Sequence, residues 1–199
     1  MPISLLASFV ATSILVDRNC LAPLDEAVGL WVERHITPYR TALMFAWTDL
    51  AATWFVLAVT TFTGVFLALT GWGYWTKRLA WTVVGCTLSI EIVKRVFQRG
   101  RPTAPHPLLE LATYSFPSGH TASATALYSF LAILICSFIP SRVWRVLVWT
   151  AAVCIIGGVA FSRVYLGAHY LSDVAGGLIM GLVWLSLAPQ FVRKGARES

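Results

Sequence analysis

Long stretches without charged residues constrain the fold of this chain more than any other feature. Residues 50–76 contain no charged side chain, and residues 111–141 contain only His120 among titratable acids and bases. Each stretch exceeds the roughly 20 residues that a helix needs to cross a bilayer. Charged residues make up 12% of the sequence, whereas about 25% is typical of soluble domains. The sequence therefore predicts a polytopic membrane protein.

The apolar segments predict an all-α membrane bundle of about six transmembrane helices, formed by a single domain over residues 1–199. Five spans are expected at residues 50–71, 78–97, 119–139, 143–162 and 170–190. Residues 3–16 are shorter than a full crossing and follow no basic segment. We interpret them as a short, uncleaved first span rather than a cleaved signal peptide.

A surface amphipathic helix is expected near the N-terminus, after the first span. Apolar residues recur there at helical spacing, at Leu21, Leu24, Val28, Trp31, Val32 and His35, with Asp25, Glu26, Glu33 and Arg34 at the other positions. Such a helix can lie on the membrane surface or pack on the bundle as a loop helix. The sequence favours the two interpretations equally.

The distribution of basic residues predicts the orientation of a chain that crosses six times. One side would hold Lys77, Arg78, Arg142, Arg145, Arg193, Lys194 and Arg197, and the other eight basic residues would lie opposite. Three of those eight belong to the candidate site described below, which leaves seven against five. Because cytoplasmic loops are enriched in Lys and Arg, we expect both termini in the cytoplasm and the site on the outer side.

The net charge of +6 suits anionic headgroups or phosphate substrates. Nucleic acid is a poor candidate, because the basic residues are divided between two membrane faces. The four cysteines, Cys20, Cys86, Cys136 and Cys154, are scattered and form no Cys-x-x-Cys pair. We therefore expect them to fill the core rather than to bind a metal or form disulfides.

The first cluster of polar residues, at the end of an apolar span, contains Lys94, Arg101 and Pro102. Ionisable residues are costly at such places unless they have a function. We expect the helix to end at Gly100, and Pro102 disfavours helical geometry at Arg101. Arg101 can then return toward Lys94, so that two cations converge on one anion.

An alternative explanation of this cluster is structural. Glu91 can pair with Lys94 or Arg95 at helical spacing while the basic side chains extend to lipid headgroups. Arg95 and Arg99 fit this alternative better than a role in the site.

The second cluster, Pro117-Ser118-Gly119-His120, precedes a long apolar helix. Backbone N–H groups at a helix N-terminus bind anions, and glycine lets a ligand approach the backbone closely. Ser118 can bind phosphate, cap the helix, or do both. His120 then faces the bound anion, whereas His106 has no such neighbour and is interpreted as a loop residue.

The third cluster contains Ser162, Arg163, His169 and Asp173. We expect His169 and Asp173, four residues apart, to share a face in the opening turns of the last helix. The carboxylate can then fix the imidazole tautomer and leave the other nitrogen as a nucleophile or base, although a hydrogen bond that merely ties the helix end is equally compatible. Arg163 can bind a phosphate oxygen.

Together the clusters resemble the three-part motif of the type 2 phosphatidic acid phosphatase family, membrane lipid phosphatases related to vanadium haloperoxidases. The matching segments are Lys94-x6-Arg101-Pro102, Pro117-Ser118-Gly119-His120 and Ser162-Arg163-x5-His169-x3-Asp173, complete and in order within residues 94–173. The resemblance also implies a bacterial cytoplasmic membrane protein of about six helices.

The resemblance implies roles for these residues. His169 would be the nucleophile, Asp173 its orienting partner, and His120 the acid that protonates the leaving oxygen. The phosphate oxygens would be held by Lys94, Arg101, Ser118, Gly119 and Arg163, while Ser162 and Pro102 would only shape the site. No metal or other cofactor is expected, and one carboxylate within the clusters is too few for a magnesium site.

The expected function is hydrolysis of a phosphorylated membrane lipid through a phosphohistidine. Undecaprenyl diphosphate, phosphatidylglycerol phosphate, phosphatidate and phosphorylated lipid A are candidate substrates. The alternatives are a lipid-to-lipid phosphotransferase and a non-catalytic protein that binds or transports anionic lipids. The two histidines and Asp173 favour an enzyme, since binding an anion requires only cations.

Overall fold

The computed structural model describes residues 2–102, 109 and 113–188, which form eight α-helices. In chain order these are α1 (Pro2–Asp17), α2 (Ala22–Glu33), α3 (Pro38–Asp49), α4 (Thr53–Leu69), α5 (Gly73–Phe97), α6 (Gly119–Phe138), α7 (Arg142–Tyr165) and α8 (Leu171–Leu187). The predicted all-helical bundle is confirmed for the described residues.

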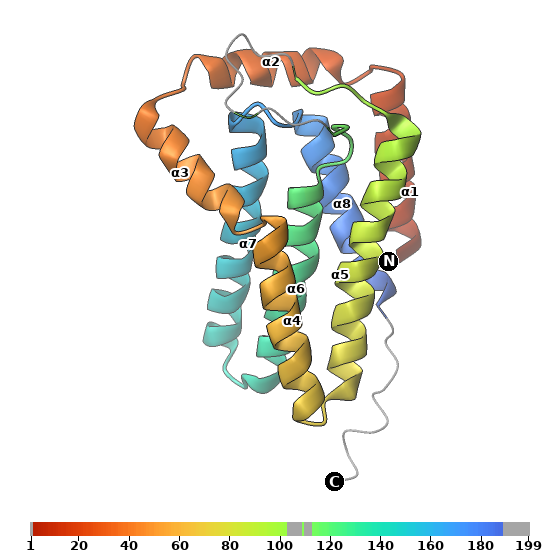
Figure 1. Cartoon of the computed structure of the whole chain (residues 1–199), viewed down its shortest axis with the longest axis vertical. Coiled ribbons are helices and arrows are strands. Elements are labelled where there is room, and N and C mark those ends of the chain that lie inside the picture. Colours follow the sequence, from red (N-terminus) through yellow and green to blue (C-terminus); the bar gives the residue numbers. More distant parts are fainter. Residues whose placement is uncertain (1, 103–108, 110–112, 189–199) are drawn as a thin grey trace.

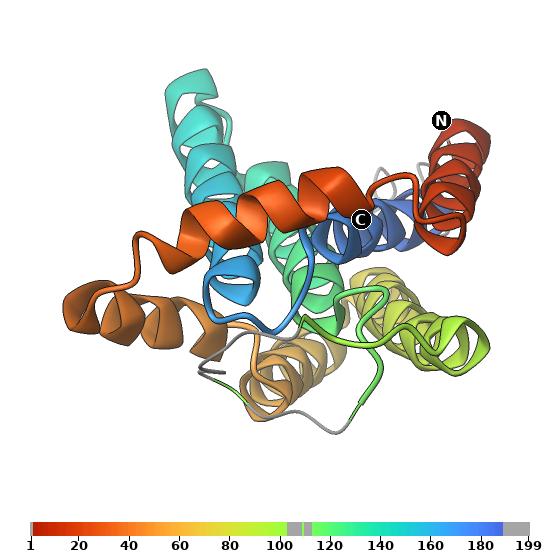
Figure 2. The same ribbon diagram turned by 90° about the horizontal axis from the view of Figure 1, so that it is seen from above.

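Helices α1 and α4 to α8 run alongside one another, and α2 lies across one end of the bundle (Figures 1 and 2). Helix α3 slants from this end, which we call the α2 end, down to the start of α4 (Figure 1). The end of α5, the start of α6 and the turn between α7 and α8 also lie at the α2 end (Figure 1). The turns between α4 and α5 and between α6 and α7 lie at the opposite end.

Several helices are suited to crossing a membrane. By length and composition α6, α7 and the run Pro38–Leu69, which joins α3 and α4, could each span a bilayer. Helices α1 and α2 together form a broken apolar pair bent by 81°, and α8 is a shorter apolar helix. The chain is thus an integral membrane protein, while the count of six crossings stays a prediction.

Helix α3 was not anticipated from the sequence. Its N-terminus has a recognisable cap, because Thr37 accepts a hydrogen bond from the backbone N–H of Arg40 at 3.3 Å and Pro38 occupies the first turn. The short length of the helix and its polar Thr and Arg residues concealed it beside the longer apolar stretch that follows.

Helix α2 packs on α7 and α8, while its position at the membrane surface stays a prediction. Its predicted faces were partly wrong. Asp25 and Val32 are buried, whereas Leu24 and Trp31 are about half exposed. Asp25 lies four residues after Leu21 and so belongs to the buried stripe of the helix.

Small residues let α6 and α8 pack closely. A Cβ atom at Gly177 would lie 2.6 Å from the carbonyl oxygen of Ser118, and one at Gly181 would lie 2.6 Å from Cβ of Thr125. Glycine is therefore required at both positions for this packing. The core-filling interpretation holds for Cys86 and Cys136 but is wrong for Cys20 and Cys154, which are exposed; all four thiols are free.

Candidate active site

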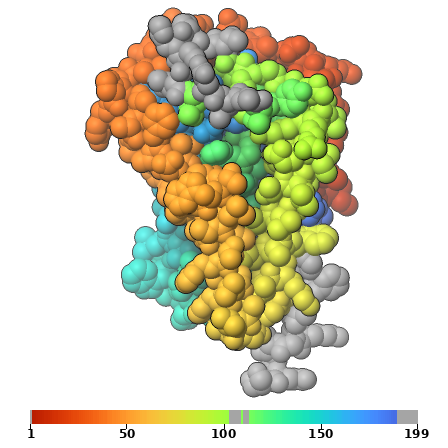
Figure 3. Space-filling view, viewed as in Figure 1, coloured from red at the N-terminus to blue at the C-terminus, as the bar shows by residue number. Residues whose placement is uncertain are grey.

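All three predicted clusters meet at the α2 end of the bundle. His120, in the first turn of α6, lies within electrostatic range of Lys94, Arg101, Arg163 and His169. The space-filling view shows the face between α4 and α5 hollowed near this end, with green atoms from the start of α6 visible inside (Figure 3). Residues from the ends of four helices thus surround one small region. His106 lies outside the described residues.

Arg101 reaches this region from the chain after α5. Its guanidinium donates hydrogen bonds to the carbonyl oxygens of Thr113, Tyr114 and Ala168 and to the Thr113 hydroxyl. Its Nη1 lies 3.5 Å from Nε2 of His169. These anchors fix the Arg101 guanidinium beside the ring nitrogen that was predicted to be the nucleophile. Its pKa is lowered by burial, although Asp173 opposes this.

The end of α5 differs from the expectation. The helix ends at Phe97 rather than at Gly100, because Gln98 adopts a left-handed conformation with φ of 45° and its N–H closes on the carbonyl oxygen of Lys94. The earlier stop lets the chain turn back toward the bundle at Arg99.

Lys94, in the last turn of α5, points toward the N-terminus of α6. Its Nζ lies 3.9 Å from the position that a Cβ on Gly119 would occupy. Glu91 forms no ion pair with Lys94 or Arg95 among the ion pairs of the described residues. The close pairing in the structural alternative is therefore not formed by Lys94, although Glu91 lies within electrostatic range of it.

Ser118 occupies the N-cap position of α6, but its side chain does not cap the helix. Instead its fully buried hydroxyl accepts a hydrogen bond from Thr121 at 3.0 Å, and its backbone N–H donates to the carbonyl oxygen of Asp173 at 3.0 Å. The first N–H groups of a helix have no partner within the helix. Those of α6 open beside the Lys94 ammonium group, an arrangement suited to an anion.

Arg163, in the last turn of α7, is 3% exposed. Its Nη1 donates to the hydroxyl of Thr48 on α3 at 2.7 Å, while its Nε has no hydrogen-bond partner among the described residues. A buried guanidinium N–H without a partner is costly, and an anion would satisfy it. Ser162 donates a hydrogen bond to the carbonyl oxygen of Val159 at 2.7 Å, in the turn of α7 that precedes Arg163.

The pair of His169 and Asp173 has a different local geometry from the one expected. Helix α8 begins at Leu171, so His169 lies in the preceding turn rather than on a shared helix face. Its Nδ1 lies 3.5 Å from Oδ2 of Asp173 and has no closer polar partner in the described part of the chain. Burial lowers the pKa of His169 to about 4, although Asp173 opposes this, so the imidazole is neutral at neutral pH.

Asp173 is fully buried and its oxygens are occupied. Oδ2 accepts hydrogen bonds from the Ser115 hydroxyl at 2.5 Å and from the Tyr170 N–H at 2.9 Å, and Oδ1 accepts one from Arg99 at 2.5 Å. The carboxylate is therefore held in a fixed orientation by neighbouring groups. The structural interpretation of Arg99, pairing on α5 or contact with headgroups, is wrong because Arg99 binds this carboxylate.

Four contributors to the site were missed from the sequence: Asp25, Thr48, Ser115 and Arg99. Only Arg99 carried a usable signal, since it lies two residues before Arg101 in the same segment. The others come from segments whose proximity to the site depends on the tertiary fold.

Comparisons with known proteins identify the family of this chain. The family model of the PAP2 superfamily matches residues 75–197. Phosphatidylglycerophosphatase B of Bacillus subtilis is 30% identical, over 97% of this chain and 95% of its own length. A lipid A 1-phosphatase of Rhizobium johnstonii is 32% identical, over 57% of this chain and 46% of its own length.

A solved structure is also similar. The crystal structure of a transmembrane PAP2-type phosphatidylglycerolphosphate phosphatase from Bacillus subtilis aligns with a TM-score of 0.83 at 28% identity, over 100% of this chain and 98% of the other. The crystal structure of Aquifex aeolicus LpxE shares the fold, with a TM-score of 0.63 at 19% identity over 83% of this chain and 94% of the other. The chain belongs to the PAP2 superfamily. Like the membrane lipid phosphatases of this superfamily, it is a hydrolase that does not require a metal ion.

Proposed function

We propose that this enzyme hydrolyses a phosphate ester of a membrane lipid by a two-step reaction through phosphohistidine at His169. The proposal rests on one observation: two imidazoles and three cations lie close together at the α2 end, and one of the imidazoles, that of His169, lies next to the buried carboxylate of Asp173. The cations Lys94, Arg101 and Arg163 provide the charge for a phosphate dianion. Binding alone would not require the imidazoles.

In the first step Nε2 of His169 attacks phosphorus and the bond from phosphorus to the lipid oxygen breaks. The charge of the bound phosphate dianion would offset the neighbouring cations and keep His120 protonated, so that it can donate a proton to the departing oxygen, which leaves as the lipid alcohol. Asp173 holds the Nδ1–H side of the His169 ring and stabilises the positive charge that forms on it. The 3.5 Å between Nη1 of Arg101 and Nε2 of His169 places a phosphate-binding cation beside the attacking nitrogen.

In the second step water attacks the phosphohistidine. His120, now neutral, accepts the proton of that water, and the bond between phosphorus and Nε2 breaks to release inorganic phosphate. Charge on the equatorial oxygens would be stabilised in both steps by the three cations, by the Ser118 hydroxyl and by the N–H group of Gly119 at the start of α6. Such fixed donors supply most of the stabilisation in phosphoryl transfer.

Phosphatidylglycerophosphate is the substrate we propose to test first. The Bacillus subtilis protein named for this activity aligns over nearly the whole chain. Phosphatidate, a phosphorylated lipid A and undecaprenyl diphosphate remain candidates. We further propose that the site faces the outer side of a bacterial cytoplasmic membrane and that both termini are cytoplasmic.

Phosphate release from the four lipids by purified protein tests the function. Release should persist in excess chelator, and His169→Ala, still folded in detergent, should abolish it. Undiminished turnover by that variant would refute the assignment of the nucleophile. A labelled diphosphate donor separates hydrolysis from transfer to a second lipid, and saturable binding without turnover would indicate a lipid-binding protein.

A further inference from the structure

Arg99 joins two carboxylates that come from distant parts of the chain. Its Nη1 binds Oδ1 of Asp173 on α8 at 2.5 Å, and its Nη2 binds Oδ2 of Asp25 on α2 at 2.9 Å. The Asp25 side chain is 2% exposed and that of Asp173 is fully buried. The guanidinium also lies over the ring of Tyr170, 4.3 Å from its centroid. A single rotamer of Arg99 therefore contacts both carboxylates and the Tyr170 ring.

Asp25 is also bonded to the residue that precedes Asp173. Its Oδ1 accepts the backbone N–H of Ser172 at 2.9 Å, and its Oδ2 accepts the Ser172 hydroxyl at 2.5 Å. The N–H of Ser172 is one of the first in α8, which lack partners within the helix. Asp25 therefore fixes the opening turn of α8 from a helix that lies across the end of the bundle.

The charges of this cluster do not balance. One guanidinium faces two buried carboxylates, and a buried charge is costly unless it is fully paired. The surplus negative charge lies against His169, where Arg101 and Arg163 are also within electrostatic range. For stability alone a neutral pair in place of Asp25 and Arg99 would be at least as favourable. The ionic arrangement instead suits a carboxylate that must stay ionised and correctly oriented.

Helix α2 also borders a cavity that contains residues of the active site. This cavity of about 640 Å³ lies beneath the helix and is lined by Asp25 and Glu26 of α2 and by Arg99, Arg101 and His169. A movement of α2 would therefore change the contacts of the carboxylate and the access of water to the histidine together.

We propose that Asp25 and Arg99 are positioning residues for the reaction: they hold Asp173 in the orientation that supports His169, which makes α2 a part of the active site. The proposal rests on the roles proposed for His169 and Asp173. It concerns the chemical step and not phosphate binding, because Lys94 and Arg163 make none of the contacts described for this cluster.

Steady-state kinetics of three variants tests this proposal. Asp25→Asn keeps an acceptor for the Ser172 N–H but removes the charge, and Arg99→Gln removes the bridge. We expect each to lower kcat by about 100-fold, the cost of a misplacement of about 1 Å. KM and the inhibition constant of inorganic phosphate should stay near the parent values. Arg99→Lys should retain more activity than Arg99→Gln.

Asp17→Asn is the matched control, since Asp17 is an exposed acid at the end of α1 and does not line the cavity beneath α2; it should keep the parent kcat. The proposal is overturned if Asp25→Asn and Arg99→Gln keep the parent kcat. It is also overturned if they lose phosphate inhibition together with turnover, which would show a merely structural role. His169→Ala in the same assay distinguishes failure of this proposal from failure of the proposed function, because turnover by that variant would refute the proposed function itself.

Discussion

At the scale of single residues, the role of His120 depends on the leaving group. An alcohol is a poor leaving group and needs a proton, whereas a phosphate monoester leaves readily without one. We expect His120→Ala to slow hydrolysis of a lipid monophosphate by about 100- to 10,000-fold, the usual contribution of a general acid. The loss on a lipid diphosphate should be clearly smaller. Initial rates of phosphate release on both substrates measure the difference.

His35→Ala serves as the control for this comparison. His35 lies after α2, stacks on Trp31, and its ring hydrogen-bonds to the carbonyl oxygen of that residue. The control should match the parent rate on both substrates. Equal losses on the two substrates in His120→Ala would remove the general-acid role.

The buried imidazole of His169 predicts a pH dependence of stability. Its pKa is about 4 in the folded chain because of burial, with Asp173 opposing the shift, against 6.5 when unfolded. Between these values the unfolded state binds more protons, so stability falls as pH drops from 6.5 toward 4. When the pH is lowered from about 7.5 to 5, the titration of His169 should reduce the free energy of unfolding by about 2 kcal/mol.

His169→Gln removes that titration. In detergent, the apparent Tm of the variant should therefore fall less between these two pH values than the Tm of the parent, whatever its absolute stability. Parallel decreases in the two proteins would contradict a neutral, buried His169.

The motif residues could be assigned to the site from the sequence because each carries chemistry at a helix boundary. Asp25 and Arg99 could not, for a physical reason. An acid on an amphipathic helix normally belongs to the solvent face, and an arginine near a helix end normally extends to headgroups. Asp25 is buried and Arg99 is partly buried because each compensates the charge of the other, and the separation of the pair along the chain hides that pairing.

At the scale of secondary structure elements, the contact of α6 with α8 sets the position of the Ser118 segment. A methyl group at Gly177 would meet the Ser118 carbonyl oxygen at 2.6 Å and the Ala122 nitrogen at 3.3 Å. Since this contact involves backbone atoms, the helices must separate. We expect Gly177→Ala to lower the Tm and to abolish phosphate release.

Gly157→Ala is the matched substitution, because no atom lies within 4 Å of its Cβ position. Glycine to alanine within a helix is otherwise favourable by roughly 0.5–1 kcal/mol. Gly157→Ala should therefore keep the parent activity and an equal or higher Tm. If Gly177→Ala kept the activity and Tm as Gly157→Ala is expected to do, the tight packing of α6 against α8 would be refuted.

Helix α3 contributes Thr48, whose hydroxyl is the acceptor for Arg163. Valine has nearly the same shape but cannot accept a hydrogen bond, so Thr48→Val should leave the guanidinium without an anchor. Loss of a hydrogen bond to a charged group costs about 1.5–3 kcal/mol. We therefore expect kcat/KM for the lipid substrate to fall by about 10- to 100-fold, as measured by initial rates at low substrate concentration.

Thr61→Val makes the same substitution at an exposed position on α4 and should leave kcat/KM unchanged. An unchanged kcat/KM in Thr48→Val would mean that Arg163 is held without α3. The sequence did not predict α3, because a tertiary contact rather than an apolar pattern gives this short helix its place.

At the scale of the whole molecule, the sequence predicted the helical bundle better than its placement in a membrane. Continuous apolar stretches specify the helices α6 and α7 directly. The first apolar segment is bent sharply at its end, and α5 carries Lys94 and Glu91 within its length. Length and apolarity therefore do not fix the number of crossings, whereas the site requires its residues to reach a single end.

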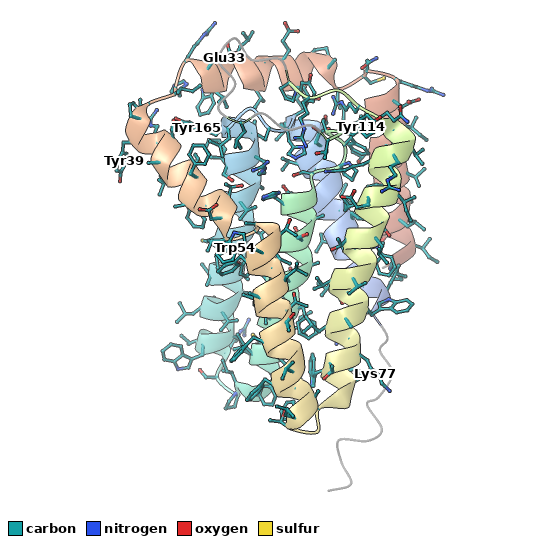
Figure 4. The ribbon with its side chains drawn as sticks, in the orientation of Figure 1. Glu33, Tyr39, Trp54, Lys77, Tyr114 and Tyr165 are labelled. Atoms are coloured by element: carbon teal, nitrogen blue, oxygen red, sulfur yellow. The ribbon has the colours of Figure 1, made fainter. Side chains whose placement is uncertain are left out.

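The arrangement of the helix ends predicts a testable orientation. Glu33 and Tyr114 lie at the α2 end and Lys77 at the opposite end (Figure 4). Cys20, exposed between α1 and α2, is a natural reporter of the α2 end. If the site faces outward, a membrane-impermeant maleimide should label Cys20 in sealed right-side-out vesicles, and Cys20→Ser should abolish that label. Gly73→Cys, introduced in the Cys20→Ser background at the exposed start of α5, should react only after permeabilisation. The reverse pattern would place the site in the cytoplasm and show that the small excess of basic residues at the opposite end does not determine the topology.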